Sequence, residues 1–145
     1  MSRKIFVNLP VTDLARAVAF YQAIGAHRDD RFSDDTAVAM VLSDTIHVML
    51  LTHAKFRQFT PRPIADARAA TEVLIALDVE SRDAVDTVVG RAAAAGGQAD
   101  PGPVQDLGFM VSRSIADPDG HIWELFWMDP VTAAQGVADT VAAGA

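Results

Sequence analysis

Residues 117–125 read DPDGHIWEL, and this stretch combines a turn with the start of a strand. Its first four residues are typical of a tight turn, because Pro presets one backbone dihedral and Gly accepts a left-handed conformation. The residues after the turn are mostly apolar and β-prone, so a strand is predicted over 122–127. The segment before the turn, 107–115, is also strand-like, and the turn therefore joins two strands.

The strand after this turn has a counterpart earlier in the chain. Residues 121–125, HIWEL, align with residues 47–51, HVMLL. Residues 75–79, IALDV, align in the same way with residues 7–11, VNLPV. A period of about 70 residues indicates two copies of one module.

Each copy has the order strand, helix, strands. In the first copy, strands are predicted over 5–11, 36–43 and 46–52, with an edge strand and turn in 27–35 and a helix from Thr12 or Asp13 to Gly25. In the second copy, strands are predicted over 72–79, 107–115 and 122–127, with a helix from Ser81 to the Gly96-Gly97 pair. The predicted fold class is therefore α+β, with two βαβββ modules.

The modules are predicted to form a single domain over residues 1–130. Module one covers 4–53, a linker covers 54–70 and module two covers 71–129. The tail, 131–145, is rich in Ala, Gly and Thr with little periodicity, so we expect a frayed or weakly helical end.

Composition excludes several functional classes. The chain has 145 residues, half of them hydrophobic, with a formal net charge of −7 and no cysteine. The acidic balance disfavours nucleic-acid binding, and no apolar run reaches the ~18 residues of a membrane span. The missing cysteines exclude disulfides, thiolate catalysis and Cys-ligated metals. Because the N-terminal residues show no apolar export stretch, a cytoplasmic location is expected.

Two stretches together resemble a known superfamily. Residues 5–14, IFVNLPVTDL, followed by Ala19-Phe20-Tyr21 and Gly25, are similar to the first module of the vicinal oxygen chelate superfamily. Residues 117–125 resemble the signature near the end of its second module. The superfamily includes glyoxalase I, fosfomycin- and bleomycin-resistance proteins, extradiol dioxygenases and methylmalonyl-CoA epimerase. The resemblance covers about residues 4–128. It implies a half-open curved sheet covered by helices, a ligand or divalent metal on the concave face, and a homodimer.

The resemblance also implies where metal ligands would stand. Metal-using members place a His on the first strand and a Glu on the last strand of each module. Those positions fall here on the residues Phe6, Leu50, Leu74 and Glu124. Only Glu124 offers a lone pair suited to a divalent metal, and one carboxylate cannot hold a catalytic ion. No metal and no other cofactor are therefore predicted.

An oxygen-rich site remains the alternative. Asn8 and Glu72 share faces with Phe6 and Leu74 by strand alternation, so Asn8, Glu72 and Glu124 could bind metal after a register shift on two strands. His47 and His121 are expected on the opposite face from Glu124, as packing or turn-capping residues.

The apolar replacements predict a small-molecule pocket, because such pockets combine apolar walls with a few polar groups. The predicted ligand-binding residues are Phe6, Asn8, Val48, Leu50, Glu72, Leu74, Glu124 and Phe126, with Phe56 and Phe59 from the linker facing inward. Glu124 could act as a general acid or base if the protein is an enzyme, or pair with a cationic ligand. The linker carries four Lys and Arg residues against the single acid Asp66, so it is either a solvated connector or a lid.

Three functions remain open. The first is metal-free binding of a small organic molecule. The second is a glyoxalase-like lyase, isomerase or dioxygenase with a divalent metal. The third is a filled barrel that serves dimerisation or binds a partner.

Overall fold

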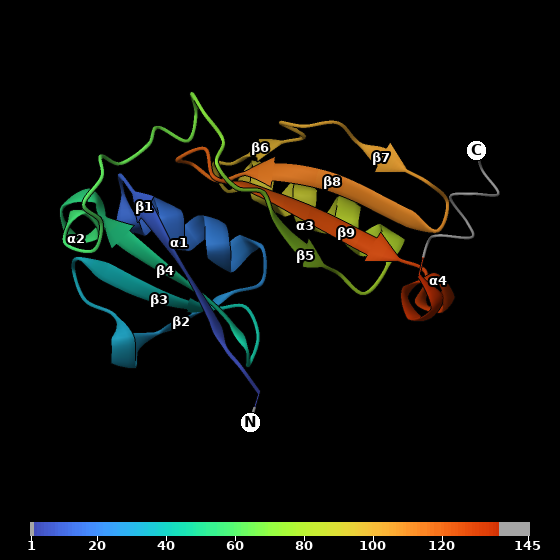
Figure 1. Ribbon diagram of the computed structural model, residues 1–145, viewed down its shortest axis with the longest axis horizontal. Coiled ribbons are helices and arrows are strands. Elements are labelled where there is room, and N and C mark those ends of the chain that lie inside the picture. The colour runs from blue at the N-terminus through green and yellow to red at the C-terminus, as the bar shows by residue number, and fades with distance from the viewer. Residues whose placement is uncertain (1, 137–145) are drawn as a thin grey trace.

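The protein is described by a computed structural model that covers residues 2–136. Figure 1 shows two modules side by side, joined by a linker that arches between them. The first module contains β1 (Ile5–Val11), α1 (Leu14–Ala23), β2 (His27–Asp29), the 3-10 helix η1 (Asp30–Phe32), β3 (Ala37–Val41) and β4 (Ile46–Thr52). The linker begins with α2 (His53–Arg57). The second module contains β5 (Ile75–Asp78), α3 (Arg82–Ala94), β6 (Gln98–Ala99), β7 (Gln105–Asp106), β8 (Met110–Ala116) and β9 (Ile122–Met128), followed by α4 (Pro130–Gln135).

The two modules have the same strand order. The first sheet runs β1-β4-β3-β2, and the second runs β5-β9-β8-β6 with the short β7 paired to β8. In each module the first strand pairs in parallel with the last, and the remaining pairs are antiparallel. The α+β class and the duplicated βαβββ pattern are therefore confirmed.

Side-chain caps set where the two long helices begin. Asp13 accepts a hydrogen bond from the backbone N–H of Arg16 at 3.0 Å, and Ser81 accepts one from Ala84 at 3.0 Å. Each cap satisfies an amide that has no partner inside its helix. Of the two predicted caps for α1, Asp13 is the one used, and Gly25 follows the helix with a φ of 107°.

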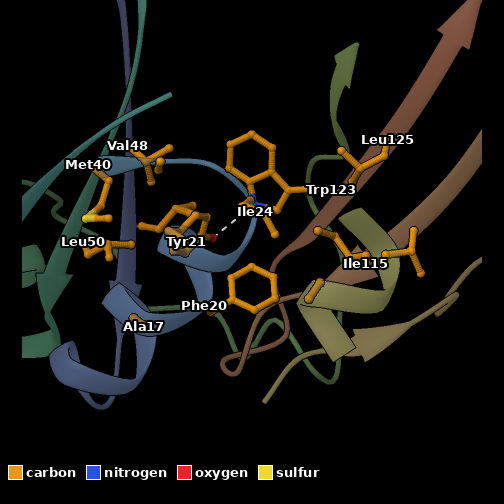
Figure 2. Close-up of a cluster of buried hydrophobic side chains, with 14 of the residues drawn as sticks. Ala17, Phe20, Tyr21, Ile24, Met40, Val48, Leu50, Ile115, Trp123 and Leu125 are labelled. Atoms are coloured by element: carbon orange, nitrogen blue, oxygen red, sulfur yellow. Dashed lines mark hydrogen bonds between the residues drawn. The ribbon is translucent and has the colours of Figure 1, made fainter. Parts of the chain in front are cut away.

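Helix α1 lies between the two sheets. Figure 2 shows Phe20 and Tyr21 on α1 between Val48 of the first sheet and Trp123 of the second. All four side chains are at most 1% exposed. The Tyr21 and Trp123 rings meet edge to face, with centroids 6.0 Å apart. One core therefore serves both modules, and Trp123 packs beneath the helices.

The turn at residues 117–120 binds the first module through its two aspartates. Asp119 Oδ1 accepts hydrogen bonds from the backbone N–H and the hydroxyl of Thr12, at 3.0 and 2.8 Å. Asp117 Oδ2 accepts one from the Tyr21 hydroxyl at 2.7 Å, and that hydroxyl in turn accepts one from Trp123 Nε1 at 3.1 Å. The turn at residues 117–120 of the second module is thus hydrogen-bonded to the first module.

Some boundaries differ from the predictions. The linker opens with the one-turn helix α2, which Thr52 caps by accepting from the Lys55 N–H at 3.2 Å. The strand predicted over 107–115 begins only at Met110, because residues 107–110 form the tight turn that joins β8 to the short antiparallel strand β7, with the Leu107 N–H donating to the Met110 carbonyl oxygen at 2.8 Å. In the tail, α4 covers Pro130–Gln135, and residues 137–145 lie outside the described part. Among the helices described, none is long and apolar enough to cross a membrane.

Candidate functional site

Each sheet has one face on the shared helical core and one face turned away from it, called here its outward face. On the second sheet, Trp123 and Leu125 are buried against the core, so Glu124 and Phe126 between and beyond them belong to the outward face. Ala76 pairs with Glu124 across β5 and β9 and is exposed. Leu74, just before β5, is 56% exposed. Leu74, Glu124 and Phe126 are therefore together on one face, as the sequence predicts.

The first sheet places a different set of residues on its outward face. The register between β1 and β4 pairs Phe6 with His47 and Asn8 with Met49. Phe6 is 53% exposed, and its ring stacks on His47 with the centroids 4.6 Å apart. The outward face of this sheet therefore carries Phe6, Asn8, His47 and Met49.

Val48 and Leu50 are corrections to the predicted site. Both side chains are fully buried in the core beneath α1, on the opposite side from Phe6 and Asn8. The aligned repeat was one residue out of register on β4, and a slip of one residue moves every side chain to the other face. His47, expected toward the helices, lies on the outward face for the same reason.

The corrected register identifies the fourth ligand position. Met49 pairs with Asn8 as Glu124 pairs with Ala76, so Met49 is the structural equivalent of Glu124. The four positions that the resemblance assigns to metal ligands thus hold Phe6, Met49, Leu74 and Glu124. A thioether is a soft ligand that suits copper(I) better than the hard divalent ions.

The residues do not fit a divalent metal centre. Glu124 alone supplies an oxygen at these positions, and within residues 2–136 no three His, Cys, Asp or Glu side chains gather closely enough to hold an ion. The oxygen-rich alternative also fails to assemble. Asn8 and Glu72 line a pocket under the linker, and Glu124 is not among the residues that line it.

That pocket, called here the linker pocket, has a volume of about 370 Å³ and lies where β1, the linker and the start of β9 meet. Of the predicted ligand-binding residues it contains Asn8, Phe56 and Glu72. Its volume is in the range of small-molecule sites. Phe59 is a correction, because its side chain is 70% exposed and has the Lys55 ammonium 5.6 Å from its ring centroid.

The linker pocket also includes residues that were not predicted as site residues. Arg62, Ile64 and His121 line it. The excess of basic residues in the linker indicated that a cation such as Arg62 could line a site. The sequence pattern could not indicate which of these Lys and Arg side chains would line a cavity. His121 has the turn-capping role expected of it: its backbone N–H donates to Asp117 Oδ1 at 2.9 Å, and its Nε2 lies 2.8 Å from the Pro10 carbonyl oxygen.

The Glu124 side chain is more accessible to solvent than a carboxylate inside a closed barrel would be. Its side chain is half-buried, and no hydrogen bond or ion pair to it is formed within the described residues. The two buried carboxylates, Asp117 and Asp119, both accept hydrogen bonds, although the second oxygen of Asp119 has no partner within the described residues. Burial raises the pKa of Asp117, which receives hydrogen bonds from Tyr21, Asp119 and His121. Glu124 and the exposed Asp78, which pairs with Phe126 across β5 and β9, are therefore carboxylates on the outward face of the second sheet that are available to a ligand.

Comparison with known proteins gives a family and several solved structures. The model of the Glyoxalase/Bleomycin resistance protein/Dioxygenase superfamily matches residues 5–125. A hypothetical protein from S. aureus is 26% identical with a TM-score of 0.72, over 87% of this chain and 94% of that one. No curated protein matches the chain.

Two further structures share the fold at lower identity. A glyoxalase-related enzyme from Fulvimarina pelagi has a TM-score of 0.72 at 21% identity, covering 87% of this chain and 88% of that one. A genomically encoded fosfomycin resistance protein from Listeria monocytogenes has a TM-score of 0.62 at 23% identity, covering 87% of this chain and 90% of that one.

Proposed function

The chain belongs to the Glyoxalase/Bleomycin resistance protein/Dioxygenase superfamily, and from that membership we propose that it binds a small organic molecule in a largely apolar site without a metal ion. The observation that carries the proposal is the residue content of the four ligand positions. Phe6, Met49 and Leu74 replace three of the four ligands, and only Glu124 retains one. A fold alone does not define a reaction, so the function is argued from these side chains.

We propose further that the site is completed by a second copy of the chain. The outward faces belong to two separate sheets whose other sides pack on the same core, with Phe6 on the first sheet and Glu124 on the second. Phe6 and Leu74 are each more than half exposed, as are their neighbours Ile5 and Val73. In a homodimer the first sheet of one copy could cover the second sheet of the other and shield these apolar side chains from water.

A flat, cationic organic molecule fits the proposed site best. The Phe6 and His47 rings form a stacked pair that offers an aromatic surface, and aromatic surfaces bind flat cations well. Glu124 supplies a negative charge without a partner among the described residues. In this reading the protein sequesters its ligand, and the superfamily's metal-dependent lyase, isomerase and dioxygenase reactions remain the alternative.

A cytoplasmic location stays a prediction of the sequence, to be checked by cell fractionation.

The test uses a matched pair of fluorescent probes, N-methylacridinium and neutral acridine under mildly alkaline conditions. After exhaustive dialysis against a chelator, we expect fluorescence polarisation to show binding of the cation in preference to the neutral ring. In Glu124→Gln the affinity for the cation should fall about tenfold, a typical effect of removing one partly buried charge.

Glu80→Gln is the matched control, because Glu80 is an exposed glutamate in the loop before α3. It should leave probe binding unchanged. Equal affinity for both probes in all three proteins would contradict the role of Glu124. Binding that disappears with the chelator and returns with zinc, nickel or manganese would instead favour the metal-dependent alternative.

A further inference from the structure

A second pocket adjoins the linker pocket on the side of the signature turn. This turn pocket has a volume of about 450 Å³, and its wall includes Arg57, Arg68 and Asp119. The two pockets share Pro10, Ile64 and His121, so they meet beneath the same segment of the linker. Together they offer more room than either does alone, and they touch the outward faces of the sheets at Asn8 and Ile122 but include neither Phe6 nor Glu124.

The charges around the two pockets are unusual for this acidic protein. Arg28, Arg31, Arg82 and Arg113 each form a salt bridge with an aspartate. Arg57 lines the turn pocket and Arg62 lines the linker pocket, and within residues 2–136 neither guanidinium forms a hydrogen bond or salt bridge. Two cations beside the same pair of cavities thus have no partner in the described part of the chain.

The nearby acids are mostly engaged with other groups. Asp66 accepts a hydrogen bond from the Arg68 backbone N–H at 3.0 Å, and Asp119 holds Thr12 through one oxygen. Glu72 lines only the linker pocket, and its side chain is exposed. The Arg68 guanidinium is already used, because it donates to the Pro118 carbonyl oxygen. Arg57 and Arg62 are therefore the cationic groups left to recognise a ligand, while the second oxygen of Asp119, also at the turn pocket, is buried without a partner in the described residues.

The remaining walls are apolar. Phe56, Ile64 and Ile122 line the linker pocket, and Phe56 comes from the same short helix as Arg57. An apolar surface beside an unpaired guanidinium favours a ligand with a hydrophobic body and a negatively charged end. Arg57 and Arg62 are both exposed, so each can line its pocket with its aliphatic part while its charged end stays hydrated.

We propose that the adjoining pockets bind a small organic anion, with its carboxylate or phosphate held by Arg57 and Arg62 and its apolar body on Phe56, Ile64 and Ile122. This site is separate from the proposed Glu124 site, and the two differ in the charge of the ligand. The linker then acts as one wall of a binding site rather than as a solvated connector.

The test measures amide chemical-shift changes in the full chain with three probes that share a benzene ring. Phenyl phosphate and benzoate carry the two candidate anionic groups, and benzyl alcohol is the neutral control. We expect the anions to shift amides in residues 8–10, 53–72 and 119–122, with benzyl alcohol binding at least about tenfold more weakly. Tighter binding of phenyl phosphate would assign a phosphate ligand, and tighter binding of benzoate a carboxylate.

The double variant Arg57→Met, Arg62→Met keeps the aliphatic bulk and removes both charges. It should weaken binding of the better anion about tenfold or more, while Arg91→Met, at an exposed arginine in the last turn of α3, should not change it. The proposal is overturned if the anions do not bind, if the double variant binds them as well as the unmodified chain, or if the shifts fall on the strand around Glu124. The two sites are distinguished by which amides change their chemical shift. A negative result for the anions therefore does not affect the proposal of a cationic ligand at Glu124, which has a separate test.

Discussion

Tyr21 joins the two modules through a single hydroxyl group. It donates to Asp117 Oδ2 at 2.7 Å and accepts from Trp123 Nε1 at 3.1 Å, and the side chain is fully buried. Burial, together with the adjacent Asp117, raises the pKa of Tyr21 well above its ordinary value. The hydroxyl therefore stays protonated and donates its hydrogen bond at neutral pH.

We expect Tyr21→Phe to destabilise the protein by roughly 2–4 kcal/mol, because it leaves a buried carboxylate oxygen and a buried indole N–H without partners. Urea unfolding at neutral pH measures the loss. Trp123→Phe, alone and combined with Tyr21→Phe, completes a double-mutant cycle, and the two losses should not add because both remove the same hydrogen bond. A loss below about 0.5 kcal/mol for Tyr21→Phe would contradict a buried network.

Asp117 should make stability fall as the pH rises. Burial raises the pKa of this carboxyl in the folded state, so between the unfolded pKa of about 3.9 and the folded pKa the native protein holds more protons than the unfolded chain. Its contribution to stability is then fully present below the unfolded pKa and is lost as the pH rises through the folded pKa. The difference in unfolding free energy between the unmodified chain and Asp117→Asn should decline over that window and then level off, as followed by urea unfolding at a series of pH values. A flat difference would show that the carboxyl titrates alike in both states.

At the scale of the element, β4 shows what the sequence could and could not predict. The strand itself was predicted correctly at 46–52, because the run IHVMLLT is apolar and β-prone. Its register was not, because the run is apolar at almost every position and Leu50 and Leu51 are both buried, on opposite faces. β9 was placed correctly because Glu124 interrupts its apolar residues and marks the outward face. Alternation can assign faces only where a polar residue breaks the pattern.

The end of α3 gives a second test at this scale. A Cβ atom on Gly97 would lie 2.6 Å from the Ala116 carbonyl oxygen and 2.9 Å from that of Ala92, and would also collide with the Phe20 ring. Two of these neighbours are backbone atoms that cannot move aside cheaply. Gly97→Ala should therefore cost about 2 kcal/mol or more.

Gly90 is the matched control on the same helix. A Cβ there meets nothing within 4 Å, so Gly90→Ala should stabilise the protein by about 0.5–1 kcal/mol through helix propensity. Thermal unfolding of both variants measures the two changes in stability. Similar effects of the two substitutions would mean that the helix end is not packed as described.

For the whole molecule, the modules could be predicted and their arrangement could not. The sequence repeat and the signature at residues 117–125 indicated two βαβββ units. No local sequence pattern indicates that α1 lies between the two sheets or that both sheets pack on one common core. Phe6 and Glu124, assigned to one concavity, belong to two separate sheets. The linker pocket was missed for a related reason, since it is built from three segments distant in sequence.

Self-association provides the test of this arrangement. If the outward faces meet in a dimer, Phe6→Arg combined with Leu74→Arg should shift sedimentation toward the monomer, because two charges would be buried without partners. Phe32→Arg is the control, because Phe32 is 66% exposed but lies in η1, away from both outward faces. A monomer already present in the unmodified chain at high concentration would contradict the dimer, as would a dimer that tolerates the double substitution.

The hydrogen bonds that join Thr12 and Tyr21 to the turn at residues 117–120 also have a consequence for folding during synthesis of the chain. The partners are separated by 107 and 96 residues along the chain. A ribosome makes the chain from its N-terminus, so α1 emerges long before the side chains that complete its packing exist. Until residue 123 has left the exit tunnel, Tyr21 has neither its hydrogen bonds to Asp117 and Trp123 nor the Trp123 ring to pack against, so the first module is an incomplete unit until then.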